Sequence, residues 1–361
     1  MARWKIAGIN FDHFHMGDNL RCAYEHPNCE IVALCDEDPE RMRSAQERFA
    51  VPPERIYTDL ERCLEETRPD IIILCPAAAR HGEWVARVAE SGAHVMVEKP
   101  FAASLEEADA MQAAMRLGGG QLMINWPLAW VPAHCTAYRL VQEGVIGELR
   151  EVHYYDGNRG PLWHGAHKLD RTAEQVAAEK PSSWFYERAR GGGSLLDYLG
   201  YGATLGTWFL DGKKPLEVTC MVDETPGLGV DEHSISIARY AFGLSKFETR
   251  WGTFSDPWTH QPQPRCGFVL CGSEGTIASY DYQPNIRVQT AARPEGYDLE
   301  VDKLAAQDRD CVAHFVHSLE QELPLRGPCS PETSRIGQQI VDTAYRSAAE
   351  KRCLPLIDRP R

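Results

Sequence analysis

The sequence predicts a doubly wound parallel α/β domain followed by an α+β domain with an open, mostly antiparallel sheet. Three observations lead to this fold class. The length of 361 residues suits about two domains. Over the first 125 residues, short apolar runs alternate with stretches of helical spacing, which is typical of repeated βα units. Strand patterns then dominate the rest of the chain. We therefore expect one domain over residues 1–125 and another over residues 126–361, with C-terminal helices able to pack back on the first.

The elements of the first domain follow from its apolar runs. Each predicted strand is apolar on both faces, as in a parallel sheet that helices cover on two sides. These strands are Lys5–Ile9, Glu30–Cys35, Asp70–Cys75 and His94–Glu98. Helical spacing separates them, and the first of the helices opens with Asp-Pro, a usual start signal. The predicted helices are Asp38–Phe49, His81–Ser91 and Ser104–Leu117.

The second domain begins with a helix and a strand and then changes character. We expect a helix over Pro132–Gly144, a strand over Glu148–Tyr155 and an irregular polar segment over Asp156–Arg190. A helix over Ser194–Leu210 follows. The predicted strands after it are Leu216–Val222, Ser234–Phe242, Lys246–Trp251, Cys266–Cys271 and Thr276–Tyr280. Two helices, near Asp308–Gln321 and Pro331–Lys351, finish the chain.

Composition and charge exclude several classes of partner. Lys and Arg number 38 against 52 Asp and Glu, and the net charge of −14 repels nucleic acid and anionic lipid. No apolar run reaches the roughly 18 residues of a membrane span, and the start has no signal-peptide pattern. The 12 cysteines form no CxxC pair, and several lie in apolar stretches: Cys35, Cys75, Cys220 and Cys271. We expect a reduced, cytoplasmic protein.

The first βα turn lies where dinucleotide-binding folds carry GxGxxG. Of those glycines only Gly8 is present; Asn10 and His13 replace the others. Asn tolerates the left-handed backbone of the turn, but its side chain takes up room near a pyrophosphate. On its own the loop favours a βα turn without a ligand.

The end of the second strand bears on cofactor choice. Asp36 can accept from both hydroxyls of an adenosine ribose and would repel a 2′-phosphate. No Arg follows at once, so NAD is favoured over NADP. The alternative is that Asp36 only begins the helix cap at Asp38.

Several later motifs together resemble one enzyme family. They are Cys75-Pro76-Ala77-Ala78-Ala79-Arg80-His81, Gly92-Ala93-His94-Val95 leading into Glu98-Lys99-Pro100, Gly144-Val145-Ile146-Gly147-Glu148, Trp184, GGGSLLDYLGY from Gly191 to Tyr201, and Gly272-Ser273-Glu274-Gly275-Thr276. In order and spacing the chain resembles the Gfo/Idh/MocA family of NAD(P)-dependent oxidoreductases over essentially its whole length. The resemblance implies a Rossmann domain, then a domain whose open sheet covers the substrate and serves for homo-oligomerisation.

The resemblance also implies roles for particular residues. Lys99 would lie beside nicotinamide and substrate, and Asp197 on the reacting hydroxyls. Tyr201 falls where most members carry a catalytic histidine, although the glucose-fructose oxidoreductase branch also has tyrosine there. The expected cofactor-binding residues are Gly8, Asn10, Phe11, Asp36, Pro76, His81, Glu98 and Lys99. The incomplete glycine loop and the tyrosine are departures from the family pattern.

The spacing of Asp197 and Tyr201 puts them four apart on one helix, hence on one face. Oxidation of an alcohol needs a group that takes the hydroxyl proton, and a phenol of pKa about 10 is a poor base near neutrality. An ammonium at Lys99 within hydrogen-bond reach would lower the pKa of Tyr201, so we expect the two to act as an acid–base pair. The alternatives are a buried Asp–Tyr hydrogen bond that only holds the helix, and a solvated lysine at a strand end.

Aromatic and polar residues of the irregular segment are candidates for substrate contact. We expect aromatic rings here to contact the apolar face of a sugar, with polar side chains around them that bind its hydroxyls. The candidate residues are Asn158, Arg159, Trp163, His164, His167 and Trp184. The alternative is a loop folded on its own aromatic anchors. Histidine pairs invite a metal interpretation, but Cys311, His314 and His317 step by three on a predicted helix with no fourth ligand, so we expect no metal.

The leading hypothesis is an NAD-dependent oxidoreductase that moves a hydride between nicotinamide and a hydroxyl or keto carbon of a carbohydrate or polyol. A second hypothesis is a glycoside-cleaving enzyme that recycles NAD through oxidation and elimination. A third is a non-catalytic, sugar-sensing descendant. In each case the partner is a small carbohydrate, and neither nucleic acid nor a membrane is expected.

Overall fold

A parallel sheet organises the first part of the chain. The computed structural model describes residues 3–224, 227 and 229–359. The first sheet has six strands in the order β3-β2-β1-β4-β5-β6, and every neighbouring pair is parallel. Its strands are β1 (Trp4–Ile9), β2 (Cys29–Cys35), β3 (Ile56–Tyr57), β4 (Ile71–Leu74), β5 (His94–Glu98) and β6 (Leu122–Asn125). The order reverses between β1 and β4, so a ligand crevice is expected at the carboxyl ends of these strands.

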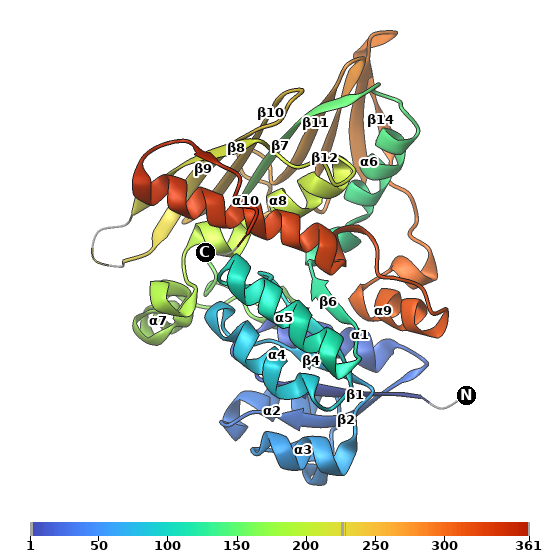
Figure 1. The fold of residues 1–361 in the computed structure, drawn as a ribbon, viewed down its shortest axis with the longest axis vertical. Helices are drawn as coiled ribbons and strands as arrows, with labels where there is room; N and C mark the ends of the chain where they lie inside the picture. Colours follow the sequence, from blue (N-terminus) through green and yellow to red (C-terminus); the bar gives the residue numbers. More distant parts are fainter. Residues whose placement is uncertain (1–2, 225–226, 228, 360–361) are drawn as a thin grey trace.

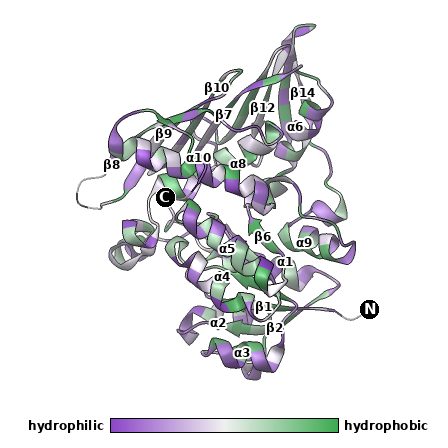
Figure 2. Ribbon diagram, in the orientation of Figure 1, coloured by the Kyte–Doolittle hydropathy of each residue, from purple (hydrophilic) through white to green (hydrophobic). Residues whose placement is uncertain are grey.

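Five helices cover this sheet. They are α1 (His15–Glu25), α2 (Pro39–Arg48), α3 (Leu60–Thr67), α4 (His81–Ala89) and α5 (Leu105–Gly118). The predicted start of α2 is confirmed, because the side chain of Asp38 caps it by accepting from Glu40 N–H at 3.0 Å. Figure 2 shows the strands of this sheet largely in hydrophobic colours, as expected for strands buried on both faces.

The second sheet has nine strands in the order β14-β13-β12-β11-β7-β10-β9-β8-β15. Among the described strands of this second sheet, only β7 and β10 pair in parallel, so the predicted open, mostly antiparallel sheet is confirmed. The strands are β7 (Leu149–Asn158), β8 (Glu217–Glu224), β9 (Asp231–Arg239), β10 (Leu244–Trp251), β11 (Gly267–Gly272), β12 (Gly275–Tyr280), β13 (Asn285–Thr290), β14 (Arg293–Glu300) and β15 (Leu354–Pro355).

Five helices belong to the second part of the described chain, and two of them, α9 and α10, pack against helices of the first sheet. They are α6 (Pro132–Gln142), α7 (Ala173–Glu179), α8 (Ser194–Phe209), α9 (Cys311–Glu320) and α10 (Pro331–Glu350). Helix α10 lies between α8 and α5 in Figure 1, and Arg335 on α10 pairs with Asp109 on α5 at 2.6 Å. Helix α9 packs against α1. The C-terminal helices therefore contact the first domain, while its proposed boundary at residue 125 coincides with the end of β6.

Helix α8 carries small residues where it meets the second sheet. A Cβ on Gly202 would lie 2.4 Å from a ring carbon of Tyr154, and one on Gly206 would lie 3.2 Å from the Phe247 ring. The helix can therefore sit close to the sheet only because these residues are glycine. Asp197 and Tyr201 on the same helix are both buried.

The segment predicted to be irregular is more ordered than expected. Strand β7 continues to Asn158, and α7 starts with a reciprocal capping box between Thr172 and Gln175. The remaining turns are 3₁₀ helices at Ala166–Lys168, Lys180–Ser182, Trp184–Tyr186 and Arg188–Arg190. Its polar composition hid these elements, because short helices held by caps have little apolar periodicity. The segment folds over the start of α1, where His167 N–H donates to Asp18 at 3.0 Å.

Cysteine burial follows the sequence prediction at three of four positions. Cys35, Cys75 and Cys220 are buried, whereas Cys271 is only half-buried. Within the described part of the chain, no helix is long and apolar enough to cross a membrane.

Candidate active site

A buried ion pair joins the two domains. Lys99 follows β5 at the carboxyl edge of the first sheet, and Asp197 lies in the first turn of α8. The Lys99 ammonium pairs with one carboxylate oxygen of Asp197, and the indole N–H of Trp251 on β10 donates to the other at 3.2 Å. Both partners are almost fully buried, at 3% and 5% exposure. Removing either partner would leave an uncompensated buried charge.

Tyr201 lies one turn after Asp197 and is buried with it. Its ring meets Trp126 edge-on, with centroids 5.4 Å apart, and the Lys99 ammonium lies 5.6 Å from the ring centroid. Burial is the main cause that raises the pKa of the Tyr201 phenol, and Glu98 and Asp197 raise it further. The expectation that Lys99 lowers this pKa is therefore wrong. The ammonium is already paired with Asp197, and nearby carboxylates outweigh it.

Glu98 forms a second buried polar cluster beside the ion pair. Its carboxylate lies 2.9 Å from Nδ1 of His15 and accepts from the side-chain amides of Asn19 and Asn125 at 3.0 and 3.1 Å. His13 lies next to this cluster, and its Nδ1 accepts from the backbone N–H of His15 at 3.1 Å. Burial lowers the pKa of both histidines, so their imidazoles are neutral. His13, His15 and Glu98 each offer a ligand atom within 4.8 Å of the others.

The ion pair opens into a small cavity of about 80 Å³ between the domains. Charged and aromatic side chains dominate its wall, among them Lys99, Asp156, Asp197, Tyr201, Trp258 and Tyr282. Asp156, at the end of β7, is buried, and burial together with the Asp281 charge raises its pKa to about 7. Sequence reasoning missed Asp156 because it was placed at the start of the irregular segment. The available signal was an acidic residue directly after the apolar strand pattern.

The predicted substrate-binding residues separate into three pairs. Asn158 and His164 line the 80 Å³ cavity, and burial lowers the pKa of His164 to about 2. Arg159 and Trp163 line neither this cavity nor its larger neighbour of about 530 Å³. Arg159 is instead held by Asp256 at 2.7 Å and lies over the Trp163 ring at 5.2 Å. For these two residues the structure favours the alternative, a loop folded on its own anchors.

The last pair, His167 and Trp184, lines the larger cavity of about 530 Å³. His167 pairs with Asp18 at 3.2 Å, and Trp184 donates from its indole N–H to the backbone oxygen of Asp12 at 3.2 Å. Trp184 also stacks on Phe185, with ring centroids 3.9 Å apart. His167 therefore holds the 156–190 segment against α1, and Trp184 holds it against the first βα turn.

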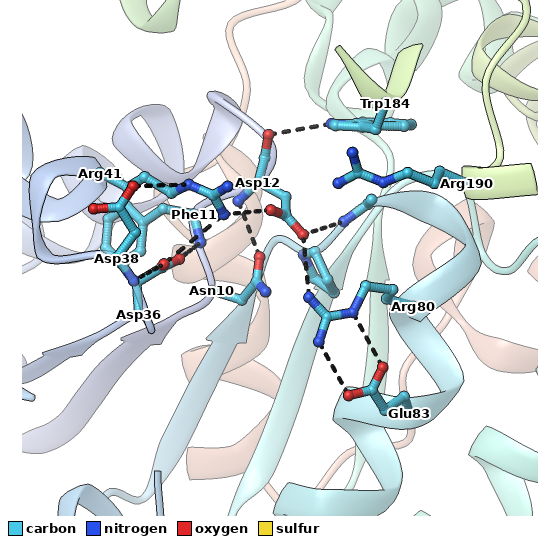
Figure 3. Close-up of polar contacts among 12 residues, drawn as sticks. Asn10, Phe11, Asp12, Asp36, Asp38, Arg41, Arg80, Glu83, Trp184 and Arg190 are labelled. Carbon is cyan, nitrogen blue, oxygen red and sulfur yellow. Dashed lines mark hydrogen bonds and ion pairs between the residues drawn. The ribbon is translucent and has the colours of Figure 1, made fainter. Parts of the chain in front are cut away.

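The first βα turn is filled by its own side chains. Asn10 has the left-handed backbone that the sequence predicted, with a φ of 63°. The N–H of Phe11 donates to the Asp36 carboxylate at 2.6 Å, and the N–H of Asp12 donates to the Asn10 side-chain oxygen at 2.9 Å. The carboxylate of Asp12 accepts from Ala77 N–H at 3.1 Å. Figure 3 shows these contacts converging on the turn.

Arginines surround the Asp12 carboxylate. Arg41 on α2 pairs with the Asp12 carboxylate at 2.6 Å and lies 3.8 Å from that of Asp36. The Arg80 guanidinium lies 3.9 Å from the Asp12 carboxylate. Glu83 holds the other side of the Arg80 guanidinium, and Arg190 extends toward the same place in Figure 3. Arg41 was missed because it follows Asp36 by five positions, in the first turn of α2, rather than directly.

Three further predicted cofactor residues have mainly structural contacts. A Cβ on Gly8 would meet the side chains of Leu20 and Met16 at 3.1 and 3.2 Å, so glycine lets α1 pack on β1. Both ring nitrogens of His81 face backbone oxygens, those of Pro76 and Phe101, at 3.2 Å. The His81 ring is therefore occupied in holding the loops after β4 and β5.

Comparison with known proteins identifies the family. Residues 3–126 match the family described as an oxidoreductase family with an NAD-binding Rossmann fold, and residues 134–278 match the Gfo/Idh/MocA C-terminal domain. The chain belongs to the Gfo/Idh/MocA oxidoreductase family, which confirms the resemblance drawn from its motifs.

Individual relatives cover different shares of the chain. The D-apiose dehydrogenase of Paraburkholderia graminis is 34% identical over 41% of this chain, and the scyllo-inositol 2-dehydrogenase of Bacillus subtilis is 29% identical over 41%. These matches span only 38% and 42% of the two relatives. A levoglucosan dehydrogenase solved with NADH and levoglucosan has the same fold, with a TM-score of 0.76 and 16% identity over 98% of this chain and 99% of its own.

The family's Rossmann domain binds NAD, and the residues at this edge fit it with one exception. Asp36 ends β2 where a ribose diol would lie, and the turn precedes the positive end of α1. Arg41 and Arg80 supply cationic donors beside the turn. The exception is the Asp12 carboxylate, which stands among these donors and would repel a phosphate. The fit therefore requires the Asp12 side chain to move away.

Proposed function

We propose that the protein is an NAD-dependent oxidoreductase that transfers a hydride between nicotinamide and a hydroxyl or keto carbon of a carbohydrate or polyol. The observation that carries this proposal is the buried Lys99–Asp197 pair, which opens into a cavity at the crevice of the first sheet. A buried charge pair at this edge costs desolvation and is more typical of chemistry than of stability.

The residues of the cavity have complementary roles toward one carbon–oxygen group. Lys99 donates a hydrogen bond to the reacting oxygen, and Asp197 accepts from a neighbouring substrate hydroxyl and so orients the ligand. Tyr201, whose raised pKa keeps the phenol protonated, donates to the same oxygen. When bound, NAD supplies the hydride acceptor or donor. Asp36 would hold its ribose, and the backbone N–H groups of Phe11 and Asp12 would hold its phosphates together with the Arg41 and Arg80 side chains beside the turn.

The substrate class is supported by the nature of the cavity and by the relatives. Carboxylates, tyrosines and an amide side chain line the cavity beside Trp258, as suits a ligand that carries hydroxyls on an apolar frame. Relatives named for apiose, scyllo-inositol and levoglucosan act on ligands of that kind. The preference for NAD over NADP rests on Asp36, since its carboxylate would repel a 2′-phosphate.

A screen of aldoses, inositols and anhydrosugars with NAD tests the proposal. We expect NADH to form with at least one compound, and Lys99→Met to lower kcat by about 10²–10⁴ because the reacting oxygen loses its cationic donor. Lys246→Met, which removes an exposed lysine from β10, is the matched control and should leave kcat unchanged. Equal kcat in wild type and Lys99→Met would remove the ion pair from the reaction.

A second candidate function is cleavage of a glycoside with NAD recycled in place. The enclosed turn favours it, because Trp184 closes over Asp12 and would hinder exchange of a bound nucleotide. Mass spectrometry of nucleotide released from the purified protein separates the two. Stoichiometric NAD or NADH that survives dilution favours recycling, whereas free exchange favours the dehydrogenase.

Homo-oligomerisation through the open sheet remains a proposal. Met221, Ile235 and Ile237 lie exposed on one face of β8 and β9, with Met221 directly opposite Ile235. Sedimentation analysis of Ile235→Lys would detect a shift toward a smaller species if this face is the interface, and no shift if it is not.

A further inference from the structure

We propose that Asp156 is the group that takes up and returns the proton of the reacting hydroxyl. This inference deepens the proposed function and rests on it. It assigns to a carboxylate of β7 the role that the family motif suggested for Tyr201. The support comes from the placement of Asp156, its hydrogen bonding and the charges around it.

Asp156 lines the same cavity as the ion pair but comes from a different element. It lies near the carboxyl end of β7, whereas Lys99 follows β5 and Asp197 lies on α8. The phenol of Tyr154, two residues earlier on the strand, donates to Oδ2 of Asp156 at 2.9 Å. This contact fixes the carboxylate against the cavity wall, with no cation paired to it among the ion pairs of the described residues.

The charges that face Asp156 come from every element packed around it. Asp281, on the loop after β12, and Asp197 on α8 both disfavour a second negative charge, whereas Lys99 favours it. Lys99 is already paired with Asp197, and Asp281 is held by Nε2 of His134 at 2.8 Å. The other titratable neighbours are Lys168, Tyr198, Tyr201, Cys266 and Tyr282. Burial and the two carboxylates raise the pKa of Asp156 to about 7, so it can both accept and release a proton near neutrality.

Tyr201 and the histidines of the cavity are less suited to this role. The pKa of the Tyr201 phenol is raised, so the phenolate is scarce at neutral pH. Burial lowers the pKa of His13, His15 and His164, so each accepts a proton poorly. Of the cavity groups discussed above, Asp156 best matches its proton affinity to the task.

The proposed step moves one hydride and one proton. In oxidation the substrate C–H bond breaks and its electron pair leaves as hydride to NAD⁺, while the O–H bond breaks and its proton moves to Asp156. A C=O bond forms, the carbon is oxidised by two electrons and NAD⁺ is reduced. Asp156 then releases the proton to solvent. In the reverse direction the protonated carboxyl returns it to the carbonyl oxygen.

The test compares Asp156→Asn with wild type over pH, using a substrate found in the screen. We expect kcat of the wild type to fall on the acid side of about pH 7, and Asp156→Asn to lose about 10²–10⁴ in kcat together with this limb. The Asn oxygen can still accept from Tyr154, so the fold is preserved, and NAD affinity by titration calorimetry should not change. Glu151→Gln, a matched carboxylate-to-amide change on the same strand, should leave the profile intact.

Tyr154→Phe gives a signature that a structural role would not produce. The Tyr154 hydrogen bond favours the Asp156 carboxylate, so its loss should move the acid limb to higher pH. Carbon-13 NMR of aspartate carboxyls in the protein without nucleotide gives an independent readout, namely one resonance that titrates near neutrality and is missing in Asp156→Asn.

Two results would overturn the assignment of Asp156 alone. Unchanged kcat in Asp156→Asn, with activity lost in Lys99→Met, would remove Asp156 while leaving the proposed function in place. Absence of a carboxyl that titrates near neutrality would do the same. No hydride transfer in the wild type with any compound would overturn the proposed function and this inference together.

Discussion

The nucleotide edge and the cavity of the Lys99–Asp197 pair differ in how their buried polar groups are paired. At the edge, the backbone N–H groups of Phe11 and Asp12 already donate to side chains of the same chain, and Asp12 is surrounded by donors. Both regions border open space, the edge at the cavity of about 530 Å³ and the Lys99–Asp197 pair at the cavity of about 80 Å³. The difference is that the chain's own side chains occupy the donors at the edge that a phosphate would need, whereas the Lys99 ammonium has more donors than Asp197 occupies.

This difference affects how tightly each region can bind its ligand. A phosphate at the edge must compete with carboxylates that are already in place, so nucleotide affinity is reduced by the cost of moving them. Groups in the cavity need little rearrangement before they meet a substrate, which is the condition for strong electrostatic effects.

The largest expected effect is in the cavity. Tyr201→Phe keeps the ring and its packing on Trp126 but removes the hydroxyl that donates to the reacting oxygen. We expect kcat to fall by about 10² or more, within the usual range for a positioned acid–base group, with little change in NAD affinity. The acid limb of the pH profile should remain, since we assign it to Asp156. Steady-state kinetics over pH measures both, and full activity would remove Tyr201 from the reaction.

The next effect is at the nucleotide edge. Asp36→Ala removes the proposed ribose contact, a charge-assisted hydrogen bond worth roughly 1.5–3 kcal/mol, and the repulsion of a 2′-phosphate. We expect titration calorimetry to show weaker NAD binding and a narrower preference over NADP. Asp59→Ala, which removes the N-cap of α3 instead, is the control. Equal effects on both dinucleotides would place Asp36 outside the site.

A smaller effect of opposite sign is expected at Asp12. Asp12→Asn keeps an acceptor for Ala77 but removes the negative charge that competes with a phosphate for Arg41 and Arg80. We expect NAD to bind about tenfold more tightly, which corresponds to about 1.4 kcal/mol. Glu83→Gln, which frees Arg80 from outside the turn, should change affinity less. Weaker binding in Asp12→Asn would mean that this carboxylate helps to hold the cofactor.

The smallest effect concerns stability and pH. The pKa of Asp156 is raised, so the folded state binds this proton more tightly than the unfolded state does. Its contribution to stability is complete below the unfolded pKa of about 4 and is lost as pH rises through about 7. Asp156→Asn stays neutral, so its melting temperature relative to wild type should be higher at about pH 8 than at about pH 5. A pH-independent difference in calorimetric scans would contradict the raised pKa.

Sequence reasoning reached the fold because the decisive patterns are local. Continuous apolar runs such as Ile71–Leu74 identify strands buried on both faces, and the Asp38 cap marks its helix. The helices α1, α3 and α7 and the strands β3, β6, β13, β14 and β15 were not predicted. The strands β3 and β15 have only two residues each, so pairing with neighbouring strands rather than periodicity holds them in place.

The site was predictable only in part, because proton affinity depends on three-dimensional surroundings. The motifs placed Lys99 and Asp197 near one another, and the structure pairs them. No spacing could show that Asp197 neutralises Lys99, which is why the expected lowering of the Tyr201 pKa was wrong. Asp156 owes its raised pKa to burial and to Asp281, a residue more than a hundred positions away.

The most direct test is titration calorimetry of NAD into protein from which any bound nucleotide has been removed. We expect saturable binding of one NAD per chain, with affinity that falls in Asp36→Ala and rises in Asp12→Asn. Absence of saturable binding in the wild type and in Asp12→Asn would contradict it, because the cavity would then lack the hydride acceptor on which the proposed reaction depends.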